Sequence, residues 1–341
     1  MKGVAPRFDH IAALTDRYGT FEHADHATRR REHGYCTDDV ARLLVVTSRE
    51  PSPTSLVRQL ARGALRFVVE AQQPSGTCRN RRASDGTWQD DAGVDDCWGR
   101  SLWGLGTAVE HAGWWLDGDP LPAFDRGAQQ RSAWPRSMAF AALGAAAVAN
   151  AHPGHRPALD LLADAADLLE PAAGDTATST GWAWPEPRLS YANAALPDAL
   201  VAAGTALDRP ALVVTGLELL AWLLERETYE DHLSVTPVGG AGPDDPPGPR
   251  FDQQAIEVAT MAEACARAAA VTGDAVWVDA VRRAAGWFDG DNDSDAVMWN
   301  RATGGGYDGL QSDGPNLNQG AESTLALIST RQQHRALGYR G

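Results

Sequence analysis

The feature that most constrains this chain is the alternation of very short and very long connections between amphipathic segments. Apolar residues recur at i, i+3, i+4 and i+7, which is the pattern of helices with one buried face. It predicts helices at residues 8–18, 38–49, 53–72, 95–112, 122–132, 135–151, 156–169, 193–206, 210–225, 251–272, 274–288 and 320–330. Short connections lie at residues 50–52, 207–209 and 273, and long ones at 19–37, 73–94, 170–192, 226–250 and 289–319.

Each long connection leads from an odd-numbered helix into an even-numbered one, so all of them emerge at the same end of the array. We therefore predict an all-α (α/α)6 toroid of six helical hairpins, with its long loops at one end. The even-numbered helices line the inside and begin at the mouth. An open solenoid of helix pairs is the alternative, but no sequence signature recurs at a fixed period. We expect one domain over residues 1–341, because no linker divides the helical pattern.

Charge and composition narrow the range of partners. The formal net charge is −15, and Lys2 is the only lysine among 30 basic residues, which argues against a nucleic-acid or anionic membrane surface. Hydrophobic residues make up 43% of the chain, enough for a sizeable core. No apolar stretch follows Met1 and no run of 18 apolar residues occurs, so we expect a cytoplasmic chain without membrane association.

We expect no metal and no cofactor. The cysteines lack metal-site spacing and are predicted to be free thiols: Cys36, Cys78, Cys97 and Cys265. The acidic run at residues 289–295 resembles the start of a calcium loop, but the required Gly and bidentate Glu are missing. A nucleotide-binding Gly-x-Gly-x-x-Gly motif and a run of parallel strands are also absent. We therefore do not expect a self-sufficient nucleotide-sugar transferase.

Acidic pairs mark the expected starts of two even-numbered helices. These pairs are Asp38-Asp39 and Asp95-Asp96. One carboxylate suffices to cap a helix, so the second is free to project into the mouth. The alternative is that both acids complement the helix dipole. Tyr35 and Arg100 lie beside the two pairs and are predicted to bind substrate.

A stiff, aromatic and acidic segment leads into the helix at 193–206. Trp182 and Trp184 precede Glu186, which lies between two prolines, and Tyr191 and Asn193 follow. Aromatic faces stack on sugar rings, and a carboxyl group in an aromatic pocket can acquire the raised pKa that a general acid needs. The alternative is that the tryptophans only fill the gap between helices.

Amide side chains gather before the last two even-numbered helices. Asp252 is a candidate N-cap, and the adjacent Gln253 and Gln254 are unusual at a helix start unless they hydrogen-bond a partner. The final turn carries Asn318, Gln319 and Glu322. Such a density of hydrogen-bonding groups predicts a turn that faces a ligand.

Several of these segments carry a family resemblance. They are residues 34–42, 99–106, 251–257 and the Asn-x-Asn-Gln-Gly-Ala-Glu-Ser-Thr motif at 316–324. Together they resemble a bacterial helical domain that occurs alone or at the C-terminus of annotated glycosyltransferases, within the six-hairpin glycosidase-like (α/α)6 group. The resemblance implies carbohydrate chemistry at the mouth. The chain departs from the pattern at Pro187 and Ala192, where the family usually has acids.

The leading hypothesis is a glycoside hydrolase that acts on a short oligosaccharide or glycoside through two carboxyl groups. The candidates are Asp39, Asp96, Glu186 and Asp252, with Glu186 as proton donor and Asp39 or Asp96 as the base. These four and Glu322 are expected to converge on one pocket.

Two alternatives stay open. The first is a noncatalytic sugar-binding accessory domain of a glycosyltransferase system. The second is a sugar epimerase or lyase, which would need a base such as His23, His26, His33, Tyr191 or Tyr307.

Overall fold

The structure, a computed structural model, describes residues 5–174, 182–246 and 248–338. Twelve α-helices dominate the described residues. They are α1 (Asp9–Ala13), α2 (Thr37–Ser48), α3 (Ser55–Ala71), α4 (Asp96–Ala112), α5 (Leu121–Gly127), α6 (Pro135–Ala151), α7 (Arg156–Gly174), α8 (Ala195–Ala206), α9 (Pro210–Arg226), α10 (Ala255–Thr272), α11 (Ala275–Asp289) and α12 (Ala321–Leu337). A short 3-10 helix covers Arg31–His33.

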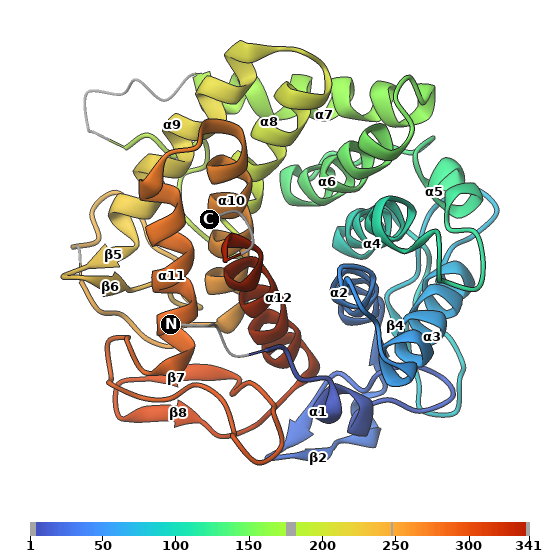
Figure 1. The fold of residues 1–341 in the computed structure, drawn as a ribbon, viewed down its shortest axis with the longest axis horizontal. Coiled ribbons are helices and arrows are strands. Elements are labelled where there is room, and N and C mark those ends of the chain that lie inside the picture. The colour runs from blue at the N-terminus through green and yellow to red at the C-terminus, as the bar shows by residue number, and fades with distance from the viewer. Residues whose placement is uncertain (1–4, 175–181, 247, 339–341) are drawn as a thin grey trace.

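The even-numbered helices form a closed inner ring, and the odd-numbered helices surround it (Figure 1). Each inner helix contacts the next, from α2 through α4, α6, α8, α10 and α12, and α12 returns to α2. Each outer helix packs against an inner neighbour. The predicted all-α toroid of helical hairpins is therefore confirmed, and the open solenoid is not, because a solenoid has no contact between its first and last units.

Inner and outer helices differ in their sequences because they are buried differently. Helix α3 has one apolar face, through which Val57, Leu60 and Ala64 enter the core. Helix α6 is buried along almost its whole length and is rich in alanine, because it packs against neighbours on several sides. One hydrophobic core runs from Phe8 to Ile328. None of the helices in the described ranges combines the length and apolarity that a bilayer span requires.

Three glycines allow α4 and α6 to approach backbone to backbone. A Cβ added at Gly99 would lie 2.1 Å from the carbonyl oxygen of Ser137. A Cβ at Gly106 would meet the oxygen of Gly144 at 2.1 Å, and one at Gly144 would meet that of Leu102 at the same distance. No side chain fits at these positions, so glycine sets the close spacing of this part of the ring.

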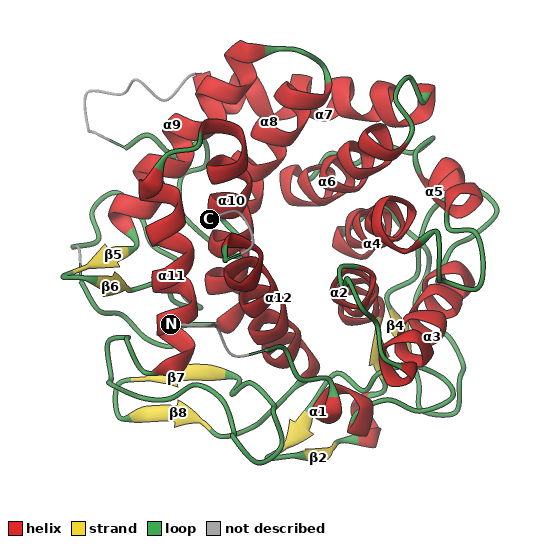
Figure 2. Cartoon of the chain, in the orientation of Figure 1, coloured by secondary structure: helices red, strands yellow, loops and turns green. Residues whose placement is uncertain are grey.

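Small two-stranded sheets lie within the long connections (Figure 2). Each pairs antiparallel: β1 (Ala24–Asp25) with β2 (Thr28–Arg29), β3 (Tyr35–Cys36) with β4 (Arg81–Arg82), β5 (Thr228–Tyr229) with β6 (His232–Leu233), and β7 (Gly309–Gln311) with β8 (Gly314–Asn316). The β3–β4 pair joins two different long connections, so the loops support one another.

Two predicted helices are shorter than the sequence pattern indicates. Helix α1 ends at Ala13 because a turn takes over, in which the amide of Asp16 donates to Gly19 and that of Tyr18 donates to the Asp16 carboxylate. Helix α5 ends at Gly127, whose carbonyl accepts a hydrogen bond from the indole of Trp98. A local turn thus ends α1, and a hydrogen bond from a residue of α4 marks the end of α5.

Helix α10 begins three residues after Asp252, which is therefore not its N-cap. The backbone of Gln253 exchanges two hydrogen bonds of 2.9 Å with Leu310, so this segment is extended. Gln254 occupies the N-cap position, and its side chain makes no capping bond.

Candidate active site

A cavity of about 240 Å³ lies where α2, α10 and α12 begin. Its lining comes from the first turns of these helices and from the connections that lead into them: Glu22, His23, Cys36, Asp38, Asp39, Arg42, Gln254, Ala255, Asp308, Gly320, Glu322 and Ser323. Residues from the opposite ends of the inner helices line a different cavity. The inner helices therefore begin at the same end of the toroid, and this end is its mouth.

Arg42 joins two carboxyl groups across the mouth cavity. Its Nη1 donates to Oδ1 of Asp39 at 2.9 Å, and its Nη2 lies 2.8 Å from Oε2 of Glu322. The side chain of Asp39 is 4% exposed and that of Glu322 is 40% exposed. Burial raises the pKa of Asp39 to about 8, although the Arg42 charge acts in the opposite direction. The two carboxyl groups thus occupy different environments on either side of one guanidinium.

Asp38 lies beside this bridge and is held by the next long connection. The side-chain oxygen of Asn80 accepts from the amide of Thr37 at 3.1 Å, and its Nδ2 donates to Asp38 at 3.1 Å. Asn80 thereby supplies the cap that the sequence assigned to one acid of the Asp38-Asp39 pair. Burial raises the pKa of Asp38, while the Arg100 charge opposes this shift.

Arg100 is buried at the centre of this group of charges. Its Nε lies 3.7 Å from Asp38, and its guanidinium lies over the ring of Phe140 at 4.0 Å. Burial and the Arg42 charge lower the pKa of Arg100, while Asp38 and Asp96 act against this shift. Nε and Nη1 have no hydrogen-bond partner among the described residues. Buried donors of this kind are costly unless water or a ligand accepts from them.

Asp96 and Tyr191 form the rim of the mouth on the α4 side. The Tyr191 hydroxyl donates to Oδ2 of Asp96 at 2.8 Å, and 43% of Tyr191 is exposed. The Arg136 guanidinium lies 4.9 Å from the centre of the Tyr191 ring. Burial raises the pKa of the Tyr191 hydroxyl above its usual range, and the Asp96 charge adds to the shift. An exposed aromatic face beside a carboxylate is suited to contact a sugar.

Glu186 does not have the geometry of a proton donor. Both of its oxygens are bound by Arg136, at 2.6 and 2.8 Å, and the Trp184 indole donates to one of them at 3.2 Å. A general acid needs an oxygen within reach of the leaving group. Glu186 instead fixes Arg136, which also donates to Asn193 at 3.0 Å.

The tryptophans of this segment are internal rather than exposed platforms. Trp182 is 9% exposed and Trp184 is 2% exposed. Trp184 stacks on Trp222 with ring centres 6.1 Å apart, and Trp182 meets the same ring edge-on at 5.1 Å. The alternative given above, in which these side chains fill the space between helices, describes what the structure shows.

Four further candidates are held by internal hydrogen bonds, so their side chains support the loops. Tyr35 donates to Asp16 at 2.9 Å and is fully buried. The other three are Asn193, which donates to Glu257 at 3.2 Å, Gln253, which accepts from Trp287 at 3.2 Å, and Gln319, which accepts from Thr303 at 2.6 Å.

The remaining candidates lie at the surface around the mouth. Asp252 is exposed, accepts from Gln311 at 3.4 Å and is not part of the cavity lining. Asp95 is the exposed N-cap residue of α4 and makes no side-chain capping bond. Asn318 accepts from the amide of His26 at 2.9 Å. The structure therefore brings Asp39 and Glu322 together, places Asp96 at the rim, and leaves Glu186 and Asp252 outside the cavity.

Several charged residues in and around the site were missed in the sequence, including the lining acids Glu22 and Asp308. Arg42 is a buried cation in the second turn of α2, Arg136 is one in the first turn of α6, and Glu257 is a buried acid in the first turn of α10. Glu257 accepts from the amides of Ala192 and Asn193 at 2.5 and 3.2 Å and so holds the loop before α8. The signal was available, because charged residues on nearly all-apolar helices are rarely buried without a partner.

One group could hold a metal ion. Among the described residues, ligand atoms of Glu22, Cys36 and Asp39 lie within 4.8 Å of one another. Burial raises the pKa of the Cys36 thiol well above its ordinary value, and Asp38 adds to this shift. Two residues of the acidic run 289–295 are turned inward: Asp293 binds His232 at 2.8 Å, and Asn292 donates to two backbone carbonyls. The other acids of the run are exposed. All four cysteines are free and buried.

Comparison with solved structures places the chain among the helical toroids. A sugar epimerase from a ruminal bacterium superposes with a TM-score of 0.72 at 10% identity, over 95% of each chain. Cellobiose 2-epimerase from Bacillus thermoamylovorans superposes with a TM-score of 0.70 at 12% identity, over 97% of this chain and 95% of the epimerase chain. The chain has the (α/α)6 fold.

Glycoside hydrolases share this fold with lower scores. A family 76 α-mannanase from Bacteroides thetaiotaomicron gives a TM-score of 0.61 at 8% identity, over 90% of this chain and 87% of that one. No family model and no curated protein sequence matches the chain. These solved neighbours are carbohydrate-active enzymes, and identities this low carry over the fold but not the reaction.

Proposed function

We propose that this protein is a carbohydrate-active enzyme that hydrolyses a glycosidic bond, with Asp39 as proton donor and Glu322 as base. The observation that carries the proposal is the bridge in which Arg42 contacts both carboxyl groups, at 2.9 and 2.8 Å. Because one guanidinium contacts both, the two contacting oxygens lie less than about 9 Å apart, which does not exceed the separation of acid and base pairs in glycoside hydrolases.

The different environments of the two groups suit different roles. A pKa of about 8 means that Asp39 carries a proton at neutral pH, which it can give to the leaving oxygen. Glu322 is ten times more exposed, 40% against 4%, and can activate a water molecule. Paired carboxyl groups with separated pKa values are the pattern that supports acid and base catalysis in one site.

The lining of the cavity favours neutral substrates. Among the described residues, Arg42 is the only arginine or lysine in the lining. Five carboxyl groups line the cavity: Glu22, Asp38, Asp39, Asp308 and Glu322. Acids and amides bind sugar hydroxyls, whereas an anionic sugar would be repelled. A short neutral oligosaccharide or glycoside therefore fits this mouth better than a uronic acid or a sugar phosphate.

A sugar epimerase is the second candidate. His23 lines the same cavity, with its Nε2 3.7 Å from Oε1 of Glu22, and could remove a proton from a carbon next to a sugar carbonyl. The higher TM-scores of the two epimerases agree with this possibility. The sequence motif at 316–324 supports a third candidate, a sugar-binding domain that accompanies a glycosyltransferase.

Product analysis in D₂O separates the three candidates. The purified chain is incubated with neutral aryl glycosides, oligosaccharides and free sugars, and the products are followed by NMR and by reducing-end detection. Hydrolysis creates new reducing ends, and the first anomer formed reports inversion or retention. Epimerisation creates no new ends but places deuterium on the sugar. Sugar binding with neither change supports the accessory domain and contradicts the proposal.

A further inference from the structure

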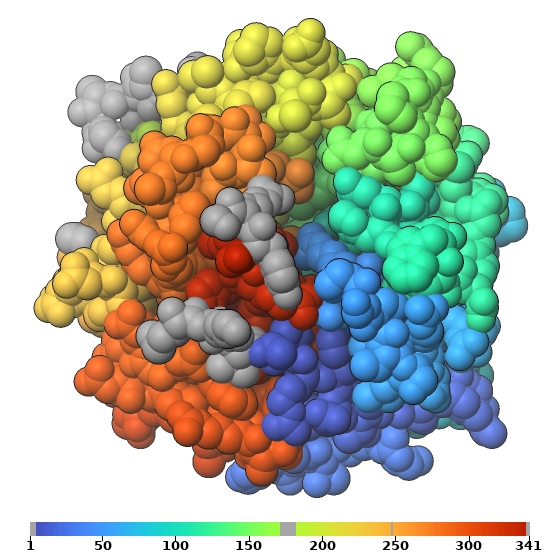
Figure 3. Space-filling model, viewed as in Figure 1, coloured from blue at the N-terminus to red at the C-terminus, as the bar shows by residue number. Residues whose placement is uncertain are grey.

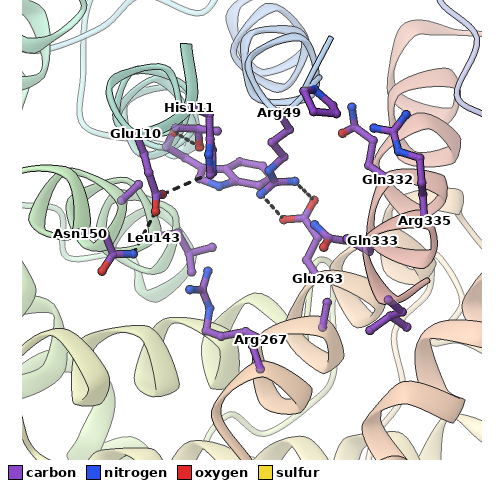
Figure 4. Close-up of a pocket in the computed structure, with 18 residues that line it drawn as sticks. Arg49, Glu110, His111, Leu143, Asn150, Glu263, Arg267, Gln332, Gln333 and Arg335 are labelled. Carbon is purple, nitrogen blue, oxygen red and sulfur yellow. Dashed lines mark hydrogen bonds and ion pairs between the residues drawn. The ribbon is translucent and has the colours of Figure 1, made fainter. Parts of the chain in front are cut away.

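A second cavity lies at the end of the toroid opposite to the mouth. It has a volume of about 440 Å³ and is lined by the C-terminal ends of α2, α4, α6, α10 and α12. We call it the rear pocket (Figure 4). In Figure 3 the surface is hollowed near the centre, between α12 and α2. This volume lies within the range of about 300 to 1,000 Å³ that is typical of ligand pockets, so the rear pocket is large enough for a monosaccharide.

The rear pocket is separate from the mouth. Between them the axis narrows to a cavity of about 20 Å³, which holds at most a single water molecule. Arg42 reaches this constriction from the mouth, and Trp103 and Glu263 reach it from the rear. A sugar cannot pass through such a space, so a ligand in the rear pocket would occupy its own site.

The arginines around the rear pocket already have anionic partners. Arg49 lies 3.2 Å from Glu263. The other two pairs are Arg267 with Asp198, at 2.5 Å, and Arg335 with Glu50, at 2.9 Å. Their charges are therefore balanced within the protein, and an anionic ligand would have to compete with these carboxylates.

Glu110 leaves the pocket with a surplus of negative charge. Its nearest basic neighbour is His111, with Nε2 at 3.5 Å. Burial lowers the pKa of His111, and the Glu110 charge opposes this shift. The Asn150 amide donates to the other oxygen of Glu110 at 3.2 Å. The ends of the inner helices add partial negative charge, which further disfavours an anion.

Gln332 presents an unused hydrogen-bond acceptor at this pocket. Its Nε2 donates to the Val46 carbonyl at 2.7 Å and to Glu50 at 2.6 Å, which fixes the orientation of the amide. The residue is 5% exposed, and its Oε1 has no partner among the described residues. A buried acceptor without a donor costs about 1 to 3 kcal/mol. A ligand hydroxyl would remove this cost.

We propose that the rear pocket is a second, noncatalytic site that binds a neutral, polyhydroxylated ligand of monosaccharide size. Ligand hydroxyls donate to Glu110 and to Oε1 of Gln332, and the apolar side of the ring contacts Leu143 and Trp103. The inference does not depend on the reaction at the mouth, because it uses none of the mouth residues.

Equilibrium dialysis of the full chain against labelled D-glucose, D-mannose and glucose 6-phosphate tests this proposal. Ala266 on α10 lines the rear pocket, and a tryptophan there would fill it. Ala266→Trp should therefore remove one bound neutral sugar per chain. The matched control, Ala211→Trp, adds the same side chain at an exposed position on α9 and should leave the number of bound sugars unchanged.

A second variant guards against a folding defect in Ala266→Trp. Glu110→Gln keeps the size of the side chain but removes the charge, and should weaken the rear-site affinity about tenfold or more. The proposal is overturned if the wild type binds only glucose 6-phosphate, if Ala266→Trp binds as much neutral sugar as the wild type, or if Glu110→Gln changes nothing. A neutral sugar that is lost with Ala266→Trp but kept with Asp39→Asn supports the rear site even if the mouth proves inactive.

Discussion

Asp39 and Arg42 lie one turn apart on α2, and Nη1 of Arg42 donates to Oδ1 of Asp39 where both side chains are less than one-tenth exposed. Burying a carboxyl group and a guanidinium costs several kcal/mol, which their attraction only partly repays, and the raised pKa of Asp39 reflects this cost. Such a pair is therefore poorly explained as a source of stability. It is better explained by the chemistry of the mouth, to which Arg42 also connects Glu322.

The pairing of Glu186 with Arg136 predicts a structural role for this acid. We expect Glu186→Gln to keep turnover within about tenfold of the wild type, because Glu186 does not line the mouth cavity and Arg136 binds both of its oxygens. The loss of a charged partner should lower the free energy of unfolding by about 1 to 3 kcal/mol. Glu218→Gln, at an exposed position on α9, is the control. Kinetics and urea unfolding measure both effects. A loss of turnover above about 10²-fold in a stably folded Glu186→Gln protein would restore this residue as the proton donor.

Burial of Trp184 predicts a stability effect rather than a binding effect. Trp184→Ala should lower the free energy of unfolding by about 3 to 5 kcal/mol, because it leaves a cavity against Trp222. Trp134→Ala provides the comparison, since Trp134 is 62% exposed, and should change stability by less than about 1 kcal/mol. Chemical denaturation measures the free energy of unfolding of the two variants. Equal stability of the two proteins, with weaker sugar binding by Trp184→Ala, would support a stacking platform instead.

The site was only partly predictable from the sequence. Acids at the starts of inner helices could be found because helix capping leaves one of them free, and Asp39 and Glu322 do line the mouth cavity. The roles of Glu186 and Trp184 could not be read in this way. Their burial depends on Arg136 and Trp222, which lie in other hairpins, and a local pattern contains no information about such partners.

Two buried acids predict a pH-dependent stability. Burial raises the pKa of Glu227 to about 8 and that of Glu257 to about 7, and the Glu257 charge contributes to the shift of Glu227. A carboxyl group with a raised pKa in the folded state stabilises the fold most at pH below its unfolded pKa, and this contribution is lost as pH rises through the folded value. Stability should therefore fall between about pH 5 and pH 8.5.

Glu227→Gln removes one of these groups and keeps the acceptor for the Thr236 hydroxyl and amide. We expect its thermal midpoint to fall less over this pH interval than that of the wild type. Glu225→Gln, two residues away on the exposed face of α9, should behave like the wild type. If Glu227→Gln and the wild type lose the same stability, Glu227 does not hold its proton in the folded state.

Glycine at the contact between α4 and α6 predicts a strong effect of a single methyl group. Gly106→Ala would place a Cβ 2.1 Å from the Gly144 oxygen. The helices would have to move apart, so we expect the free energy of unfolding to fall by at least about 2 kcal/mol. Gly63→Ala on α3 meets nothing within 4 Å and should gain about 0.5 to 1 kcal/mol from helix propensity. Urea unfolding measures the free energy of unfolding of both variants. Similar values for Gly106→Ala and Gly63→Ala would contradict the close packing of α4 and α6.

The fold was more predictable than the site because helix periodicity is local. The expected ranges 38–49, 135–151 and 210–225 agree with α2, α6 and α9 within one residue at each end. Some ends differ because a distant group replaces the next turn, as when Leu310 pairs with Gln253 and delays the start of α10. Helix α12 instead continues to Leu337, beyond the expected end at residue 330. Ring closure could be inferred from loop lengths, but the α4–α6 contact through Gly106 and Gly144 could not.

The most direct test of the central claim is the rate of reducing-end release by Asp39→Asn and Glu322→Gln on a neutral glycoside that the wild type cleaves. Circular dichroism confirms folding, and Glu218→Gln, at an exposed position on α9, is the control. We predict that each mouth variant loses at least about 10²-fold in turnover, the size of a general acid or base contribution, while the control keeps its rate. Full turnover by a folded Asp39→Asn or Glu322→Gln protein would contradict the assignment of the acid and base at the mouth.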